Sequence, residues 1–132
     1  MGTRLRDRSK LLDRKRGIGM NIQIFGTKKC NDTKKAERFF KERGIKYQFI
    51  DLKEKTLSKG ELTSVSNAVG GIMNMVNPDA KDQDAVALFQ YIADEDKFGK
   101  LLENPQILKT PIVRNGKQAT LGYLPDVWKK WE

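Results

Sequence analysis

The sequence contains no histidine and a single cysteine, Cys30, among its 132 residues. Without histidine the chain cannot use Ser-His or Cys-His catalysis, and it lacks the commonest side-chain ligand of transition metals. One cysteine excludes an internal disulfide and a zinc site built from several cysteines. We therefore expect no bound metal or cofactor, and a location in the reducing cytoplasm, where a lone thiol stays free.

Long apolar runs are also missing from the sequence. No segment approaches the roughly 20 apolar residues that a membrane-spanning helix requires, and no leader indicates a secretory signal. Hydrophobic residues make up 38% and charged residues 33% of the chain, whose 132 residues suffice for one domain with a modest core. The composition predicts a soluble globular domain that does not associate with a membrane.

The formal net charge of +9 comes mostly from the first nineteen residues. Seven basic residues there face only Asp7 and Asp13, while the rest of the chain has 19 basic and 15 acidic residues, a net charge of +4. That mixed surface does not predict nucleic-acid binding. Because residues 1–19 lack apolar periodicity, we expect a leader that is disordered or not native, with the native chain starting at Met20. The alternative is a genuine basic arm that touches nucleic acid or an acidic partner.

A strand, a loop and a helix surround the only cysteine. The apolar run over 21–25 predicts a strand, and an amphipathic pattern over 31–43, with Arg43 on the apolar side, predicts a helix that ends at Gly44. Cys30 therefore lies at the first turn of a helix, where unpaired amides and the helix dipole favour negative charge. This placement favours the thiolate, which is the reactive form of cysteine.

Charged neighbours modify this expectation for Cys30. Lys28 and Lys29 add positive charge beside the thiol, whereas Asp32 opposes their effect. We therefore expect a pKa of Cys30 that is lowered but not extreme. The alternative interpretation is a half-buried cysteine that behaves as a small hydrophobe.

The middle of the chain predicts one more strand and then several helices. Alternation over 46–52 predicts a second strand, parallel to the first across a short helix. Ser58-Lys59-Gly60-Glu61 forms a capping box for a helix that stops at Gly70-Gly71. We expect residues 72–81 to be irregular, and two further helices to cover 83–93 and 97–103.

The end of the chain predicts a hairpin and a closing helix. Asn115-Gly116 is a strong hairpin signal between a third strand after Pro111 and a fourth strand over 117–121. Pro125 suits the first position of a last helix. We expect this helix to turn three residues inward: Val127, Trp128 and Trp131.

Three segments resemble the family of glutaredoxin-dependent arsenate reductases and Spx proteins. Residues 25–36 resemble the active-site segment, 67–77 the middle segment, and 108–117 the third strand and hairpin. The likeness covers 20–132. It implies an α/β thioredoxin-like fold, with a mixed four-stranded sheet flanked by helices. It also implies a helical insertion, at about 58–104, between the β-α-β unit and the C-terminal hairpin.

The resemblance also implies the residues of the site. Cys30 is the expected nucleophile, and a cis peptide is expected before Pro111, close to the thiol, although a proline that merely starts a strand is the alternative. Thr33 can hydrogen-bond the thiolate or cap the helix. The candidate catalytic residues are thus Cys30 and Thr33, and the candidate residues for binding substrate or thiol are Lys28, Lys29, Lys34, Thr110 and Pro111.

Two departures from the family's pattern bear on activity. Thr33 stands at the resolving position of the family's Cys-x-x-Cys pair, so no internal disulfide can form. Arsenate reductases of this family hold the oxyanion with several arginines, one of them just before the cis proline, where this chain has Thr110. From residue 20 onward the chain has three arginines, Arg38, Arg43 and Arg114. The first departure calls for an external resolving thiol, and the second argues against true arsenate reduction.

Three hypotheses follow for the function. The first is a single-cysteine thiol oxidoreductase, in which Cys30 forms a covalent adduct that an external thiol clears, with glutathione as co-substrate or with glutaredoxin or thioredoxin. The second is an Spx-like, non-catalytic regulator that binds RNA polymerase or another protein. The third is a degenerate family member whose thiol has no role.

Overall fold

A computed structural model describes residues 21–131, so the expected leader over 1–19 and the expected start at Met20 lie outside the described residues. The described chain begins with strand β1 (Ile22–Gly26), helix α2 (Asn31–Glu42) and strand β2 (Tyr47–Asp51). β1 and β2 pair in parallel. The predicted parallel β-α-β unit is confirmed, with element ends within about one residue of those expected.

A hairpin completes the sheet on the other side of β1. Strand β3 (Ile112–Asn115) pairs antiparallel with β1 and with strand β4 (Gln118–Leu121), which gives the strand order β2-β1-β3-β4. Asn115 pairs with Gln118, so the loop consists of Gly116 and Lys117, one residue later than the signal suggested. Gly116 has φ +61°, a conformation that favours glycine.

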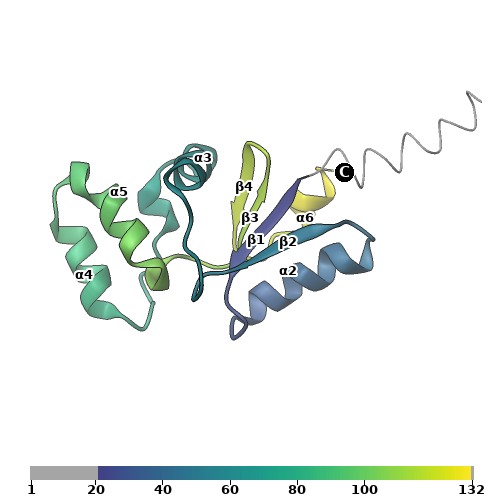
Figure 1. Ribbon diagram of the computed structural model, residues 1–132, viewed down its shortest axis with the longest axis horizontal. Helices are drawn as coiled ribbons and strands as arrows, with labels where there is room; N and C mark the ends of the chain where they lie inside the picture. Colours follow the sequence, from purple (N-terminus) through teal and green to yellow (C-terminus); the bar gives the residue numbers. More distant parts are fainter. Residues whose placement is uncertain (1–20, 132) are drawn as a thin grey trace, which may run out of the picture.

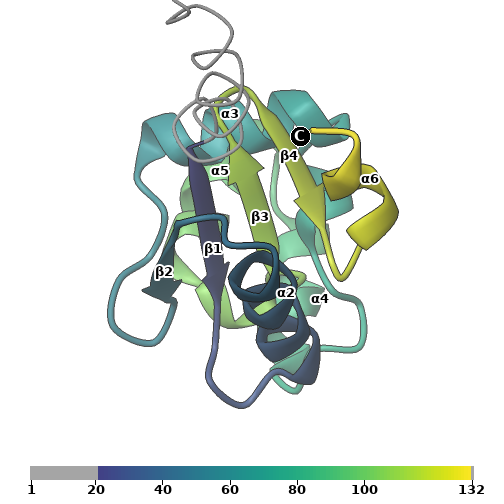
Figure 2. The ribbon, with the colours of Figure 1, turned by 90° about the vertical axis from the view of Figure 1, so that its right-hand side faces the viewer.

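The helical insertion lies between the β-α-β unit and the hairpin. It contains helix α3 (Lys59–Val69), helix α4 (Gln83–Tyr91) and helix α5 (Asp94–Glu103). The predicted capping box of α3 is present, because Ser58 and Glu61 exchange side-chain to backbone hydrogen bonds of 3.1 and 2.8 Å. The insertion lies on one face of the sheet, whereas α2 and the last helix α6 (Pro125–Lys129) lie on the other (Figures 1 and 2).

Three details of the insertion and of α6 differ from the sequence prediction. α5 begins at Asp94, three residues early, because three acidic side chains in its first turn favour a helix N-terminus. Ile72–Met75 forms a short 3₁₀ helix within a segment that was expected to be irregular. Val127, expected to face inward, is 37% exposed, because α6 turns Trp128 alone fully into the core.

The sheet separates two apolar cores. Alternation along β1 explains this division, since Ile24 points to the face of α2 and α6 while Phe25 points to the insertion. Phe40 and Trp128 fill the first core, and the indole of Trp128 donates a 2.8 Å hydrogen bond to Thr120. These two packed layers confirm the predicted mixed four-stranded, thioredoxin-like α/β architecture.

Arg43 was expected on the apolar side of α2, but it is exposed beyond the end of that helix. Its guanidinium carbon lies 5.0 Å from the ring centre of Phe39. The charged group thus covers the edge of the core instead of entering it.

A buried lysine joins two helices of the insertion. Lys97 on α5 is only 7% exposed, and its ammonium donates to the carbonyl oxygens of Phe89 (2.7 Å), Gln90 (3.3 Å) and Ile92 (3.0 Å). These carbonyls end α4, where no further helical turn satisfies them. The positive charge also suits the negative end of the helix dipole. Lys97 therefore holds the α4–α5 corner of the insertion in place.

Lys97→Met should lower the free energy of unfolding by about 1–3 kcal/mol, because the carbonyls at the end of α4 lose a buried donor. Urea denaturation measures the change. Lys100→Met is the matched control, since Lys100 lies on the same helix and forms a surface ion pair with exposed Glu103, and it should cost less than about 0.5 kcal/mol. Equal losses in both variants would show that the carbonyl contacts of Lys97 do not matter.

Candidate active site

The thiol lies at the junction between the β1 loop and α2. Cys30 is the residue immediately before α2, with extended backbone angles, and its carbonyl accepts the first helical hydrogen bond, from Lys34 (3.2 Å). Its own amide bonds back to the carbonyl of Thr27 (3.2 Å), which closes the loop into a turn. Cys30 is half-buried. The structure thus places the thiol at the helix start, as the sequence predicted.

The segment Thr110-Pro111 meets the thiol from the other side. Because β3 pairs antiparallel with β1, the start of β3 lies beside the end of β1. The Thr110 hydroxyl donates to Sγ of Cys30 at 3.2 Å, and the thiol faces the Thr110 carbonyl at 3.9 Å. The Thr110–Pro111 peptide is cis, which confirms that prediction.

The surroundings of Cys30 favour its thiolate. Burial raises the pKa of the thiol, but hydrogen bonds from the Thr110 hydroxyl, from Thr33 and from the amide of Asp32 outweigh it, so the pKa lies below its ordinary value. The amides of Asp32 and Thr33 belong to the unpaired amides at the helix start that the sequence argument invoked, whereas the Thr110 hydroxyl is a donor that the helix itself does not supply. A lowered pKa increases the fraction of reactive thiolate near neutral pH.

Thr33 lies on the first turn of α2, three residues after Cys30. It is 1% exposed, and its hydroxyl has no hydrogen-bond partner among the described residues that meets ordinary geometry. The hydroxyl nevertheless lies near enough to Cys30 to lower the pKa of the thiol, so it has a donor available for the thiolate. Gly26 makes room for Thr33, because a Cβ at position 26 would collide with the threonine side chain.

A cleft of about 760 Å³ opens beside the thiol. Of the predicted site residues, Cys30, Lys29 and Thr110 line it, whereas Lys28 and Lys34 are exposed and do not. Its other charged lining residues, which the sequence argument missed, are Lys53, Asp79, Lys81 and Asp82. Most of them belong to the insertion, and only the fold brings that segment to Cys30.

Asp82 lines the cleft and also caps the start of α4. Asp82 accepts hydrogen bonds from Gln106 (2.9 Å) and from the amide of Ala85 (3.0 Å). These bonds lower the pKa of Asp82, with the Gln106 contact as the larger cause. The carboxylate therefore stays ionised and links the start of α4 to the segment that precedes Thr110.

No arginine among the described residues lines this cleft. Arg114 lies at the far end of β3 and donates to the Gln23 side chain (2.6 Å), while Arg38 is exposed on α2. The cations of the cleft are lysines, and two carboxylates lie among them. Such a site attracts anions but lacks the forked donors that orient a tetrahedral oxyanion.

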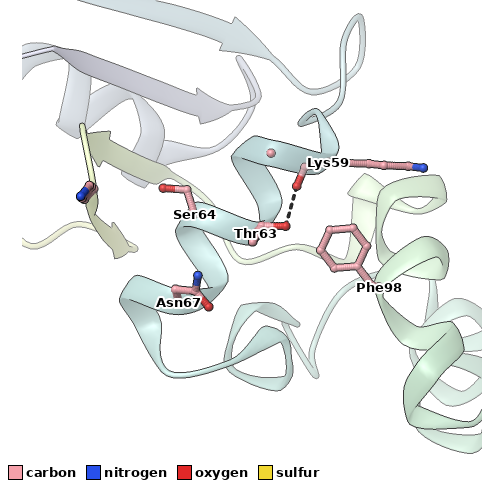
Figure 3. A pocket seen from close by; sticks show the side chains of 7 residues that line it. Lys59, Thr63, Ser64, Asn67 and Phe98 are labelled. Atoms are coloured by element: carbon pink, nitrogen blue, oxygen red, sulfur yellow. Dashed lines mark hydrogen bonds between the residues drawn. The ribbon is translucent and has the colours of Figure 1, made fainter.

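A second cavity, of about 700 Å³, lies away from the thiol along α3 (Figure 3). Lys59, Thr63, Ser64 and Asn67 line it from α3, and Phe98 borders it from α5. The side chain of Thr63 is turned back on its own helix, where its hydroxyl donates to the Lys59 carbonyl (2.8 Å). This cavity contains no nucleophile of the cysteine type, so the thiol cleft is the better candidate for chemistry.

No cluster of Cys, Asp and Glu side chains within 21–131 could hold a metal ion. Within the same range, no helix is long and apolar enough to cross a membrane.

Fold and site together define a thioredoxin-like protein with one cysteine at the start of α2. The family model described as the ArsC family matches residues 25–131, and the chain belongs to this family. A curated relative, the global transcriptional regulator Spx 2 of Oceanobacillus iheyensis, is 30% identical over 115 residues, which cover 81% of this chain and 80% of the relative. The resemblance stated from the sequence is thereby confirmed.

Solved structures agree on the fold. The arsenate reductase of Vibrio cholerae superposes with a TM-score of 0.73 at 22% identity, covering 86% of this chain and 98% of that protein. A Staphylococcus aureus protein solved by NMR has a TM-score of 0.67 at 26% identity, covering 83% of this chain and 96% of that protein. The described fold therefore matches nearly the full length of both solved chains.

Proposed function

We propose that the chain is a single-cysteine thiol oxidoreductase of the ArsC family, with Cys30 as its nucleophile. One observation carries this proposal. The Cys30 sulfur, which lies at the start of α2 beside an open cleft, accepts a 3.2 Å hydrogen bond from the Thr110 hydroxyl. A cysteine that served only as a small hydrophobe would not need donors aimed at its sulfur. The lowered pKa of Cys30 agrees with this geometry.

The reaction proceeds by thiol–disulfide exchange in two steps. The Cys30 thiolate attacks one sulfur of a disulfide, the S–S bond breaks, and the released thiolate leaves with the electron pair. A second, external thiolate then attacks the resulting mixed disulfide and restores the Cys30 thiolate. The external thiol is necessary because Thr33 occupies the resolving position and Cys30 is the only cysteine.

Glutathione is the proposed co-substrate, with glutaredoxin or thioredoxin as alternative external thiols. Lys29 and Lys53 line the thiol cleft and suit the two carboxylates of glutathione, and Asp79 suits its ammonium group. Thr33 and Thr110 stabilise the thiolate, whereas Pro111 follows Thr110 in the chain and does not itself line the cleft. Lys28 and Lys34 contribute long-range positive charge, because both are exposed outside the cleft.

Glutathione disulfide should convert Cys30 into a mixed disulfide, which adds one glutathione to the intact mass of the protein. Reduced glutathione with glutaredoxin should then return the original mass. Cys30→Ser is the control, and it should gain no adduct under the same conditions. No gain of mass by the wild-type chain would contradict the proposed mechanism, as would treatment with hydrogen peroxide and glutathione that yields only sulfinic acid.

A second candidate function is regulation without turnover. It is favoured by the relative at 30% identity that is named as a global transcriptional regulator, and the family resemblance makes RNA polymerase the partner to test. Pull-down of RNA polymerase by the wild-type chain and by Cys30→Ser separates the two functions. Equal capture by both, with no thiol exchange by the wild type, would favour the regulator.

A further inference from the structure

Three exposed apolar side chains form a patch where β4 leads into α6. Tyr123, Leu124 and Val127 are 38%, 40% and 37% exposed. Single exposed apolar residues are ordinary on protein surfaces. Tyr123 and Leu124 precede α6, and Val127 lies in its first turn, where its amide donates to the Leu124 carbonyl (3.1 Å). The three residues are thus neighbours, and contiguous apolar surface is typical of binding sites. We call these three residues the apolar patch.

The apolar patch borders the thiol through Pro111. The amide of Gly122, the residue before the patch, donates a 2.8 Å hydrogen bond to the Pro111 carbonyl, and Thr110 next to Pro111 contacts the Cys30 sulfur. α2 and α6 lie on the sheet face opposite the insertion (Figure 2). The patch therefore approaches Cys30 from the side opposite the insertion wall of the cleft.

Tyr123 is held in place although its ring is partly exposed. Its ring packs edge-on against buried Trp128, with 5.6 Å between ring centres, and the ammonium of Lys35 on α2 lies 5.7 Å from its centre. An aromatic ring fixed in this way loses little conformational entropy when a partner covers it. The patch is thus suited to act as a binding anchor.

The surface between the apolar patch and the thiol is basic. Lys34 and Lys35 are exposed on the first turns of α2, and Asp32 is the exposed acidic residue beside them. On the α6 side, Asp126 lies 3.9 Å from Lys129, which offsets its charge. A partner with an apolar centre and an acidic rim complements this surface.

The chemistry of Cys30 decides what kind of partner covers the patch. A protein that forms a disulfide with Cys30 has its own cysteine Cβ about 3.5–4.5 Å from that of Cys30. Transient redox complexes bury less than about 1,200 Å² in total, so such a partner covers up to roughly 600 Å² of surface around the sulfur. Glutathione, a tripeptide, is accommodated by the cleft and does not need the patch.

We propose that the apolar patch is the docking surface for a protein dithiol with an acidic rim, which resolves the mixed disulfide at Cys30. This inference rests on the proposed function and adds the surface on which a protein thiol docks. The first thiolate of the donor attacks the Cys30 sulfur, and the earlier adduct leaves as a thiolate. The second donor thiolate then attacks the first donor sulfur, so the donor becomes a disulfide and Cys30 is again a thiolate.

The test uses full-length protein whose Cys30 carries 2-nitro-5-thiobenzoate as a mixed disulfide. This aromatic thiol is a good leaving group, so an incoming thiolate attacks the Cys30 sulfur, and the released thiolate is coloured. Rate constants for its release are measured with reduced glutathione and, separately, with reduced thioredoxin and glutaredoxin. The patch variant is the double substitution Leu124→Gln and Val127→Gln, which leaves the net charge unchanged.

The matched control is the double substitution Leu88→Gln and Tyr91→Gln on α4, where both side chains are also exposed. The patch variant should react about tenfold more slowly than the wild type with at least one of the two protein dithiols, equivalent to about 1.4 kcal/mol. Its rate constant with glutathione should stay within about twofold of the wild-type value. The control variant should match the wild type with every reductant.

Three results would overturn the inference in distinguishable ways. Equal slowing by glutathione and by the protein dithiols would show that the substitutions disturb Cys30 itself. Unchanged rates with both protein dithiols would show that the patch is not their docking surface. A wild-type adduct that resists every reductant would refute the proposed function, and the docking role with it.

Discussion

Arsenate turnover by this chain, with glutathione and glutaredoxin supplied, is expected to remain barely above background. The cleft beside Cys30 offers three lysines and two carboxylates and, among the described residues, no arginine. A tetrahedral oxyanion carries charge on several oxygens and needs directed donors as well as positive charge. Membership of the ArsC family alone therefore does not predict arsenate reduction here.

The size of the expected defect follows from the missing donors. A charged hydrogen bond contributes on the order of 1.5–3 kcal/mol. Losing two of them would weaken transition-state binding by about 3–6 kcal/mol, or about two to four powers of ten in rate. The lysines recover part of the charge and little of the orientation.

Thr110→Arg should raise arsenate turnover, because the Thr110 side chain already reaches the Cys30 sulfur at 3.2 Å. Thr110→Lys is the matched variant, since it adds the same charge without the forked donors. A coupled assay of arsenate-dependent glutathione oxidation measures both. Robust turnover by the unmodified chain would restore arsenate reduction as its function, with lysines as the oxyanion ligands.

Phe40→Ala should lower the free energy of unfolding by about 3–5 kcal/mol. The ring is fully buried between α2 and the sheet, with its centre 5.0 Å from that of Phe39 and 5.2 Å from that of Trp128. Removing it leaves a cavity that these aromatic neighbours cannot close without moving. Chemical denaturation gives the value, and Leu88→Ala, at a 46% exposed site on α4, should change it by less than about 1 kcal/mol. A loss below about 1 kcal/mol in Phe40→Ala would mean that Phe40 contributes little to the core.

The local signals of the sequence located most of the elements. Gly44, the capping box at Ser58 and Pro125 each act through the backbone of their own segment, so the ends they mark are confirmed within about a residue. The start of α5 was misplaced because the apolar pattern of this helix begins only at Phe98, whereas three acidic residues form its first turn. Val127 was misassigned because a helix of five residues is too short for periodicity to fix its orientation.

The site was predictable only in part. Cys30 follows a strand and precedes a helix, and that placement is visible in the sequence. Thr110, which contacts Cys30, lies 80 positions away in the sequence. This contact was predicted through the family resemblance and not from a local pattern. The insertion wall, with Asp79 and Lys81, depends on how the helices pack over the sheet, and no local pattern encodes that arrangement.

The central claim is that the fold activates Cys30, and titration of its reactivity tests this most directly. The rate of alkylation by iodoacetamide, measured from pH 5 to pH 10, follows the thiolate fraction and falls as pH drops through the pKa of the folded protein. We predict a midpoint below about 8.5, the value of a free cysteine.

Thr110→Val should shift the midpoint upward, because the sulfur loses its 3.2 Å donor. Thr63→Val, at an exposed site on α3, should leave it unchanged. A wild-type midpoint at or above about 8.5, or one that Thr110→Val does not move, would contradict the claim.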